Sequence, residues 1–315
     1  MSDSALANIF CRFFELVWAN GEEIEAAQRV RYEVYCREFG FEKEEDCPGG
    51  LETDTYDSQS IHCIVRHRAS GQVAGCVRVV HTLSDDAVAE LPIERYCGHG
   101  LEHPRLHPAR LPREQICEIS RLAIPMAFRR RVGEARSPVG DVNTLLFEPE
   151  EYRTYPLLAT ALFFAADSVV ALTGLKHVFA MMQPPLARRL ARQGIHFHQI
   201  GPVIDYHGPR APYYVHADYA LCAIESSLRP LQNAVHDALE RQHATLEAHL
   251  PAATGPSHDP TLRLPTGLHA HLGMGDGAGV GEATPDHGGD RRPGRRRRQS
   301  SVDPDPSRDR ALPVG

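Results

Sequence analysis

The sequence contains no uninterrupted apolar run long enough to cross a membrane. Its best candidate, residues 157–172, is interrupted by Asp167 and is shorter than the roughly 20 apolar residues of a membrane-spanning helix. The chain begins Met-Ser-Asp-Ser, without the basic and then apolar order of a secretory signal. We therefore expect a cytoplasmic protein without a transmembrane segment.

Cysteine and histidine patterns typical of metal sites are also missing. None of the eight cysteines forms a Cys-x-x-Cys pair, which argues against both a zinc site and a disulfide framework. Two groups of histidines recur at short spacing, namely His99, His103 and His107, and His196 and His198. Prolines interrupt the first group and break the helix that its spacing would need, and the second group lies along an expected strand. The sequence predicts no metal site and mostly buried, reduced thiols.

Lysines are scarce, and phosphate-binding loops of the common types are absent. Only two of the 34 basic residues are lysines, and residues 1–250 carry 25 basic against 33 acidic side chains. Nucleic-acid binding depends on neutralising phosphates, so this negative balance argues against it. Neither a Walker loop nor a Gly-x-Ser-x-Gly elbow occurs, which argues against kinases and α/β-hydrolases.

The composition changes near residue 251. Residues 251–315 contain 11 Gly and 9 Pro but no Phe, Tyr or Trp, so they cannot bury enough apolar surface to offset the entropy of ordering. We predict a disordered tail there, with its arginine cluster at residues 291–298 solvated among acidic neighbours. Apolar spacing in residues 227–250 predicts an amphipathic helix, and residues 1–226 are the expected main domain.

The order of the expected elements predicts a mixed α/β (α+β) fold. Asn20 and Glu23 have the spacing of a capping box at a helix start, and Gly40 is expected to end that helix. We expect helices at residues 20–39, 156–173 and 186–193, and strands at residues 13–19, 60–68, 72–80, 116–124, 177–182, 195–200 and 213–224. An antiparallel first half followed by a β-α-β unit predicts a largely antiparallel central sheet flanked by helices.

Five short motifs in the first half carry charged and aromatic residues. In chain order they are Arg31-x-x-x-Tyr35, Phe41, Asp54-x-x-Asp57, Arg78 and Glu118-x-Ser120-Arg121. Arg31 and Tyr35 are four residues apart on an expected helix and therefore face the same way. On the expected strand, Glu118 and Ser120 share one face and Arg121 takes the other. A β-bulge, which is common near active sites, would bring Arg121 to the same side as Glu118.

In this order the motifs resemble the signature of the autoinducer (acyl-homoserine-lactone) synthase family, in which Phe and Trp stand at the positions of Tyr35 and Phe41. The second half resembles the related acyltransferases associated with the PEP-CTERM/exosortase system, in the segments Phe128–Arg131, Ile200–Pro202 and Tyr206–Tyr213. With the N-acyl amino acid synthases, these form a branch of the GNAT superfamily, and the expected element order is also that of the GNAT fold. The resemblance covers about residues 10–225.

The resemblance implies transfer of a long acyl group from a phosphopantetheine thioester to an amine. The implied donor is acyl-carrier protein, with acyl-CoA as the other candidate, and no cofactor would be bound permanently. The implied acceptor is a small amine or an amino acid, in a PEP-CTERM/exosortase setting. Thioester aminolysis needs a base that keeps the amine neutral and donors where the oxyanion develops.

Roles for individual residues follow from the resemblance and this chemistry. Glu118 is the expected base, acting directly or through water. Tyr35 and Phe41 are expected to form the pocket walls, and Ser120 to contact substrate. A linked ion network is expected to order the loop over the acceptor pocket; it comprises Arg31, Asp54, Asp57, Arg78 and Arg121.

The basic segment that follows admits three interpretations. Arg129, Arg130 and Arg131 have the character of a docking patch for an acidic carrier protein and its phosphate, a task that suits Arg. Residues 130–135 also fit the Arg-x-x-Gly-x-Ala pattern of the GNAT pyrophosphate loop, in which backbone N–H groups at a helix start bind phosphates. A solvated run of charges is the third interpretation.

Three other functions remain open from the sequence. One is an acyl-homoserine-lactone synthase that consumes S-adenosylmethionine. Another is a catalytically silent GNAT-like module that binds an acyl carrier, for which broken motifs would be expected. The third is an acyl-enzyme mechanism through Cys117, although no histidine is tied to it by a motif.

Overall fold

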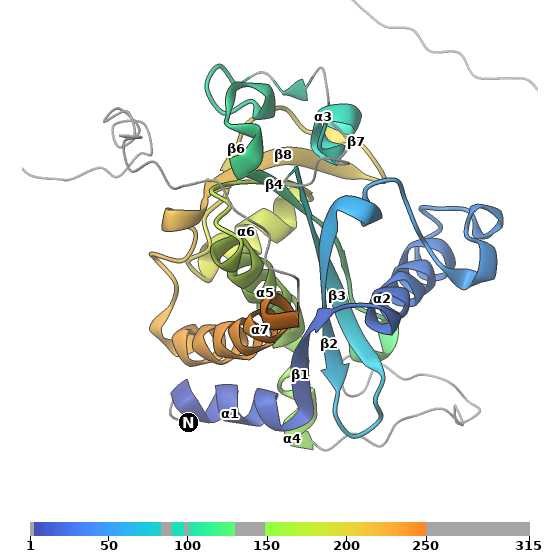
Figure 1. The fold of residues 1–315 in the computed structure, drawn as a ribbon, viewed down its shortest axis with the longest axis vertical. Helices are drawn as coiled ribbons and strands as arrows, with labels where there is room; N and C mark the ends of the chain where they lie inside the picture. Colours follow the sequence, from blue (N-terminus) through green and yellow to red (C-terminus); the bar gives the residue numbers. More distant parts are fainter. Residues whose placement is uncertain (1–2, 83–89, 98–99, 102, 130–148, 250–315) are drawn as a thin grey trace, which may run out of the picture. The chain divides into compact units, whose positions relative to one another are not determined.

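The protein is built around an eight-stranded sheet. The structure is a computed structural model that describes residues 3–82, 90–97, 100–101, 103–129 and 149–249 (Figure 1). The strand order is β1-β2-β3-β4-β5-β8-β6, with β7 paired to β8, and every pair except the parallel β4 and β5 is antiparallel. The strands are β1 (Phe14–Ala19), β2 (Ser60–His67), β3 (Val73–His81), β4 (Ile116–Ala123), β5 (His177–Met182), β6 (His198–Gln199), β7 (Ile204–Asp205) and β8 (Pro209–His216).

Helices cover both faces of this sheet. Helices α1 (Asp3–Phe13), α5 (Leu158–Leu172) and α7 (Arg229–His249) lie over one face, and α2 (Glu22–Tyr32) lies over the other (Figure 1). With both faces covered, β2 and β3 are buried along most of their length, without a regular alternation of buried and exposed residues. The remaining helices are α3 (Pro92–Cys97), α4 (Pro149–Tyr152) and α6 (Pro184–Arg192).

The two faces differ in how their apolar residues are distributed. The face under α5 and α7 carries one large core. On the other face, one cluster under α2 includes Ile64 and Cys76, and a second cluster beside α3 includes Val80 and Ile116. Arg78 lies on β3 between these clusters. A polar band therefore interrupts the apolar face, and the candidate site lies in this band.

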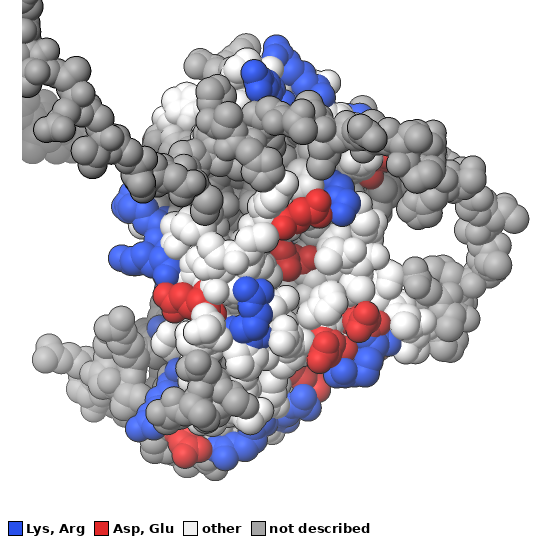
Figure 2. Space-filling model, turned by 90° about the vertical axis from the view of Figure 1, so that its left-hand side faces the viewer, with Lys and Arg blue, Asp and Glu red and all other residues white. Residues whose placement is uncertain are grey.

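One helical stretch has the length and composition of a membrane span, but it is mostly internal. Of the described residues, the window Tyr155–Leu172 has a mean hydropathy of 1.7, and 72% of it is buried inside the structure. Such burial is typical of a core helix. On one face of the molecule, basic and acidic side chains are interspersed among uncharged ones (Figure 2).

Most expected elements form, and several boundaries differ. The expected strand at 195–200 is reduced to the two residues of β6, and the strand expected at 213–224 is β8, which starts at Pro209 and ends at His216. Four elements were not predicted: the 11-residue helix α1, and the short elements α3, α4 and β7, whose two to six residues are too few to show a periodic pattern. The helix expected at 227–250 is α7, which belongs to the same compact unit as the sheet. The predicted disordered tail lies outside the described residues.

The helix expected at residues 20–39 changes type along its length. Gly21, not Asn20, occupies the N-cap of α2, and the Asn20 side chain makes no cap bond. One half of the expected capping box is present, because the backbone N–H of Asn20 donates to the Glu23 carboxylate at 3.4 Å. After Tyr32 the helix continues as a π-helix over Glu33–Glu38.

Candidate active site

A β-bulge in β4 brings the expected catalytic side chains to one face of the sheet. Arg78 of β3 pairs with Ser120, but Cys76 pairs with Ala123, so β4 carries one extra residue over this stretch. Arg121 takes up the extra residue with a φ of 51°, a left-handed conformation that is rare outside glycine and frequent at functional sites. As a result Glu118, Ser120 and Arg121 line the same pocket. The bulge predicted from the sequence is confirmed.

Three arginines and three carboxylates form a closed ring of ion pairs behind this pocket. Arg31 of α2 contacts Glu52 and binds Asp57 through two nitrogens, at 2.7 and 3.2 Å. Arg78 donates to Asp57 at 2.7 Å and to Asp54 at 2.6 Å. Arg121 closes the ring, with 2.9 Å to Asp54 and 3.0 Å to Glu52. We call these six residues the charge ring.

The charge ring is electrically balanced and mostly buried. The side chains of Arg31 and Arg78 are 0% and 1% exposed. Burial acts to raise the pKa of Asp57, but the hydrogen bonds and charges of Arg31 and Arg78 outweigh it and hold that pKa well below its usual range. Burial likewise opposes charge on Arg121, and Glu52 and Asp54 more than compensate, so its pKa is raised. Asp57 and Arg121 are therefore held in their charged forms, and the ring joins three arginines to three carboxylates.

The ring also shapes the loop that carries its carboxylates. The Asp54 side chain accepts a hydrogen bond from the backbone N–H of Tyr56 at 2.9 Å, and Asp57 accepts one from the N–H of Asp54 at 3.1 Å. Asp residues often fold their own loop in this way. Glu52 was missed from the sequence, because it lies outside the Asp-x-x-Asp motif; a third carboxylate two residues before that motif was the available signal.

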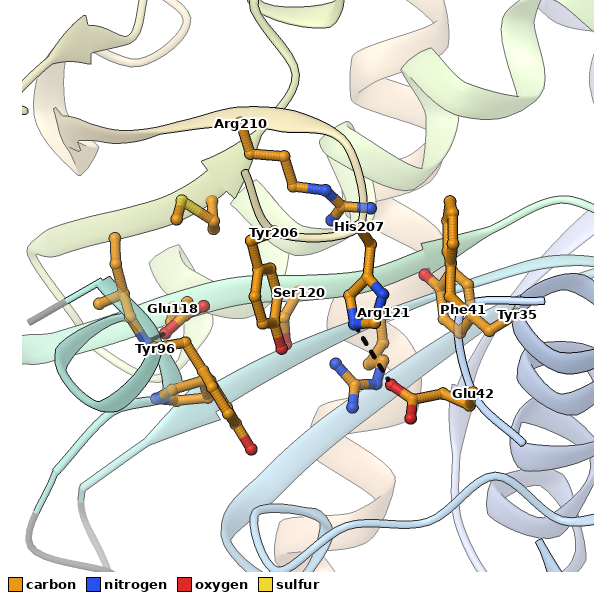
Figure 3. A pocket seen from close by; sticks show the side chains of 13 residues that line it. Tyr35, Phe41, Glu42, Tyr96, Glu118, Ser120, Arg121, Tyr206, His207 and Arg210 are labelled. Carbon is orange, nitrogen blue, oxygen red and sulfur yellow. Dashed lines mark hydrogen bonds and ion pairs between the residues drawn. The ribbon is translucent and has the colours of Figure 1, made fainter. Parts of the chain in front are cut away.

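The pocket lies in front of the charge ring, between α3, β4 and the hairpin of β7 and β8 (Figure 3). Only Arg121 of the charge ring lines it; Arg31, Arg78, Asp54 and Asp57 do not. These four were expected to order the loop over the acceptor pocket, and their ion pairs join that loop to α2, β3 and Arg121; their part in catalysis stays a prediction. The pocket is lined by Tyr35, Phe41, Glu42, Pro92, Ile93, Tyr96, Glu118, Ser120, Arg121, Met181, Tyr206, His207 and Arg210.

Glu118 is the buried carboxylate of this pocket. It is 3% exposed, and it accepts a hydrogen bond of 2.6 Å from the backbone N–H of Ile93 at the start of α3. Burial raises the pKa of Glu118 to about 7, although the Ile93 bond and the charges of Arg78 and Arg121 act to lower it. A carboxylate with this pKa can accept and return a proton near neutral pH.

The aromatic wall begins at the π-helix that extends α2. The Tyr35 hydroxyl donates to the backbone oxygen of Leu122 at 2.9 Å, which fixes it beside the β-bulge. Its ring lies 5.9 Å from the Arg121 guanidinium and 6.4 Å from the Phe41 ring. The Tyr35 backbone oxygen accepts a hydrogen bond from the Phe41 N–H at 2.7 Å. The π-helical turn therefore fixes the positions of both aromatic rings. π-Helical turns are frequent at functional sites.

A tight hairpin supplies the opposite wall. Between β7 and β8, His207 has a φ of 52°, and the N–H of Gly208 donates to Asp205 at 3.2 Å. This turn directs Tyr206 and His207 into the pocket (Figure 3). A Cβ on Gly201 would overlap with the carbonyl oxygen of Gly100, so glycine lets the segment before β7 pack against the segment after α3.

Several pocket residues were not predicted as site residues. Tyr96, Tyr206, His207 and Arg210 line the pocket together with Glu42. The segment Tyr206–Tyr213 was noted only for its resemblance. Its density of Tyr, His, Arg, Gly and Pro was the signal available, because Gly and Pro mark turns that can present polar side chains.

The pocket lies where β4 and β5 separate. Glu118 and Phe179 are register partners in these strands, and Glu118 of β4 and Met181 of β5 line the pocket. Pairing stops after Ile119 and Ala180, so the pocket opens one step further along β4. Cys117 points to the opposite face, is 0% exposed, and has a pKa raised by burial, which argues against an acyl-enzyme.

The basic segment is only partly described. Arg129 does not line the pocket; it pairs with Glu38 and lies over the Phe39 ring at 4.8 Å. The roles predicted for Arg130 and Arg131, and the pyrophosphate pattern of residues 130–135, lie outside the described residues. Docking of a carrier at this segment therefore stays a prediction.

A second, smaller cavity lies on the other face of the sheet. Ile119 of β4 and Val178 of β5 line it, whereas Glu118 and Ser120, the neighbours of Ile119 on β4, line the first pocket. The other lining residues are mostly apolar, and they are Phe163, Asp167, Val170, Ile195, Phe197, Val215, Ala220 and Leu221.

Comparison with known proteins agrees with the expected fold. Residues 30–136 match the family model of the acetyltransferase (GNAT) domain, a stretch that contains the whole charge ring and Glu118. With the largely antiparallel sheet flanked by helices, this match confirms the expected fold class and an acyltransferase domain of the GNAT type. No curated protein matches the chain.

Several solved structures are similar over most of their length. TofI in complex with an inhibitor and MTA has a TM-score of 0.46 at 18% identity, covering 70% of this chain and 96% of TofI. The AHL synthase LasI has a TM-score of 0.45 at 16% identity, covering 67% of this chain and 93% of LasI. FeeM, an N-acyl amino acid synthase from uncultured soil microbes, has a TM-score of 0.44 at 11% identity, covering 67% and 94%. Similarities at this level do not assign a substrate.

Proposed function

We propose that this protein is an N-acyltransferase that moves an acyl group from a phosphopantetheine thioester to an amine. The observation that carries the proposal is Glu118, a buried carboxylate with a pKa of about 7 that opens into a pocket beside the charge ring. A carboxylate held in this state fits the task of a general base. The acyltransferase domain match over residues 30–136 gives the same class of reaction.

Glu118 moves the proton in the proposed step. The amine nitrogen attacks the thioester carbonyl carbon, a C–N bond forms, and Glu118 takes the proton that the nitrogen loses, directly or through water. The C–S bond then breaks, and the leaving thiolate receives that proton. The products are an amide and the free thiol of the carrier.

Ser120 and Arg121 are placed to stabilise the oxyanion. Arg78 donates to the Ser120 Oγ at 3.1 Å, which leaves the Ser120 hydroxyl proton free to donate into the pocket. Arg121 lines the same pocket and is held by two carboxylates. Preorganised donors of this kind stabilise developing charge because they do not have to reorient during the reaction.

The proposal also covers the acyl donor and the biological system in which the enzyme acts. We propose acyl-carrier protein as the donor, with acyl-CoA as the alternative, and a PEP-CTERM/exosortase setting, both supported by the resemblance of residues 128–131, 200–202 and 206–213. CoA-dependent synthases such as BjaI are among the similar structures.

Intact-mass measurement of palmitoyl-acyl-carrier protein tests the proposal. The full-length protein is incubated with this donor and a panel of amines and amino acids, and each sample is compared with a no-acceptor control. We expect loss of the acyl mass that depends on acceptor and on Glu118. No acyl loss with several chain lengths, together with binding of the carrier, would instead indicate a silent binding module.

The product separates the two enzymatic alternatives. An N-acyl amine or N-acyl amino acid supports the proposal. A homoserine lactone formed only in the presence of S-adenosylmethionine would instead establish the autoinducer synthase reaction.

A further inference from the structure

A second arginine of the pocket differs from Arg121 in its surroundings. Arg210 lies on β8 opposite Ile204 of β7, and its guanidinium extends above His207 toward Phe41 (Figure 3). The guanidinium carbon is 5.7 Å from the centre of the Phe41 ring. Arg210 therefore presents a positive charge at the upper wall of the pocket.

Arg210 has no counter-ion among the residues that the structure describes. Arg121 is held by Glu52 and Asp54, whereas no described carboxylate lies within ion-pair distance of Arg210. Its Nε is buried and has no described hydrogen-bond acceptor. The side chain as a whole is only partly buried, but a buried donor without an acceptor is costly, and at a pocket wall a bound anion can supply that acceptor.

The neighbouring polar groups are engaged elsewhere. Tyr35 donates to the backbone of Leu122. Glu42 lies 3.7 Å from the Nε2 of His207, and Glu118 accepts the bond from Ile93. The described walls therefore leave Arg210 to be neutralised by a bound molecule.

The chemistry of the pocket favours a carboxylate over a phosphate as this anion. A guanidinium binds a carboxylate through two parallel hydrogen bonds. A guanidinium can bind a phosphate in the same way, and among the described lining residues Arg210 is the single cation that is not already paired with a carboxylate. Arg210 lines the same pocket as Glu118, so the anion that it binds belongs to the molecule whose amine faces Glu118, which favours a carboxylate of the acceptor.

We propose that Arg210 binds a carboxylate on the acceptor, so that the acceptor is an amino acid and not a simple amine. The acceptor's amine then faces Glu118 and its carboxylate faces Arg210. Each of these two acceptor groups lies beside a pocket residue that can interact with it. The proposal rests on the N-acyltransferase function given above. Arg210 acts as a specificity-determining residue, because it binds the acceptor's carboxylate, which takes no part in the reaction.

Pairs of acceptors that differ by one carboxylate test this assignment. The full-length protein is assayed with palmitoyl-acyl-carrier protein and with phenylalanine against phenethylamine, or leucine against isoamylamine. We expect wild-type protein to prefer the amino acid, and Arg210→Gln to lower its kcat/KM about 10- to 100-fold, the range for a hydrogen-bonded charged group. The amine should react at an unchanged rate. Arg210→Lys should restore part of the loss, and Arg192→Gln, on exposed helix α6, should change neither rate.

Equal losses for both members of a pair would overturn the assignment. A second donor, acyl-pantetheine without its phosphate, separates the other source of an anion. If the effect of Arg210→Gln disappears with this donor, Arg210 binds the donor's phosphate and the proposal is wrong.

Binding separates failure of this inference from failure of the proposed function. Thermal unfolding is measured with phenylalanine or phenethylamine, because a ligand of the native state raises its stability. If wild-type protein acylates no acceptor, the proposed function fails. Stabilisation by phenylalanine alone, lost in Arg210→Gln, would still support the carboxylate site, whereas equal shifts in both proteins would overturn it.

Discussion

The charge ring and the pocket in front of it contain the same kinds of residue in opposite states. In the charge ring each arginine contacts two carboxylates, and the charges cancel. In the pocket, burial holds Glu118 at a pKa of about 7, and Arg210 has no described counter-ion. Paired charges build the site, and the charges left unpaired are those available to substrate. Arg121 belongs to both regions and connects them.

The largest expected effect comes from removing the unpaired carboxylate. Glu118→Gln keeps the size of the side chain and can still accept the bond from Ile93, but it cannot take a proton. We expect transfer from palmitoyl-acyl-carrier protein to fall about 10²- to 10⁴-fold, the usual contribution of a general base, with an unchanged circular dichroism spectrum. Turnover equal to wild type would remove Glu118 from the mechanism.

Breaking the charge ring should act on stability rather than on chemistry alone. Arg78→Ala leaves Asp54 and Asp57 buried without one of their partners, and breaking a buried pair in this way typically costs about 3–5 kcal/mol. Chemical denaturation at pH 7 measures the free energy of unfolding. Arg66→Ala is the matched control on the same hairpin, because Arg66 is 31% exposed in its pair with Glu15, and such pairs contribute about 0–1 kcal/mol. Similar losses in the two variants would contradict the distinction.

Glu118 should lower the free energy of unfolding at the pH values at which it is ionised and can act as a base. Its pKa in the folded protein is about 7, above its ordinary value of 4.5, so its favourable contribution is complete below pH 4.5 and is lost as the pH rises through 7. Glu118→Gln should therefore be more stable than wild type at pH 8, by up to about 3–4 kcal/mol given about 1.4 kcal/mol per pKa unit, and should lose this advantage at pH 4.5. A stability difference that does not change with pH would show that burial does not raise the pKa of Glu118.

The smallest effect is expected at the junction of the two regions. Tyr35→Phe removes the hydrogen bond to the Leu122 backbone beside the bulge but keeps the aromatic wall. We expect a loss of about 0.5–1.5 kcal/mol in stability, the net value of one hydrogen bond, and at most a few-fold loss in transfer. Tyr35→Ala should reduce transfer further, because it also removes the ring that faces Arg121.

The sequence analysis found the charge ring better than the pocket, for physical reasons. The ion network was expected from the resemblance, which marks Arg31, Arg78 and the Asp-x-x-Asp pair by their motifs, and the bulge was expected because it aligns Arg121 with Glu118. Glu52 was missed because a loop carboxylate has no periodicity. The ring closes only because the sheet register brings residues far apart in the sequence together. Short motifs carry no information about that register.

The unpaired half of the site was harder to predict. Arg210 and His207 are set by a hairpin whose strand β7 has only two residues, too short for a pattern. The π-helix that places Tyr35 was also not predicted, since its side-chain spacing resembles that of an α-helix in the sequence. The central sheet was predicted well, because β3 and β5 are mostly apolar runs and β2 is joined to β3 by a short turn.

The pH dependence of transfer tests most directly that the unpaired carboxylate is the base. The rate constant for amide formation from palmitoyl-acyl-carrier protein, with saturating acceptor, is measured from pH 5.5 to 9 in wild-type protein and in Glu118→Gln. The pKa of about 7 for Glu118 predicts that the wild-type rate rises through about pH 7 to a plateau and that this rise is absent in Glu118→Gln. A rise that follows only the acceptor's own amine pKa, and is the same in both proteins, would contradict the account.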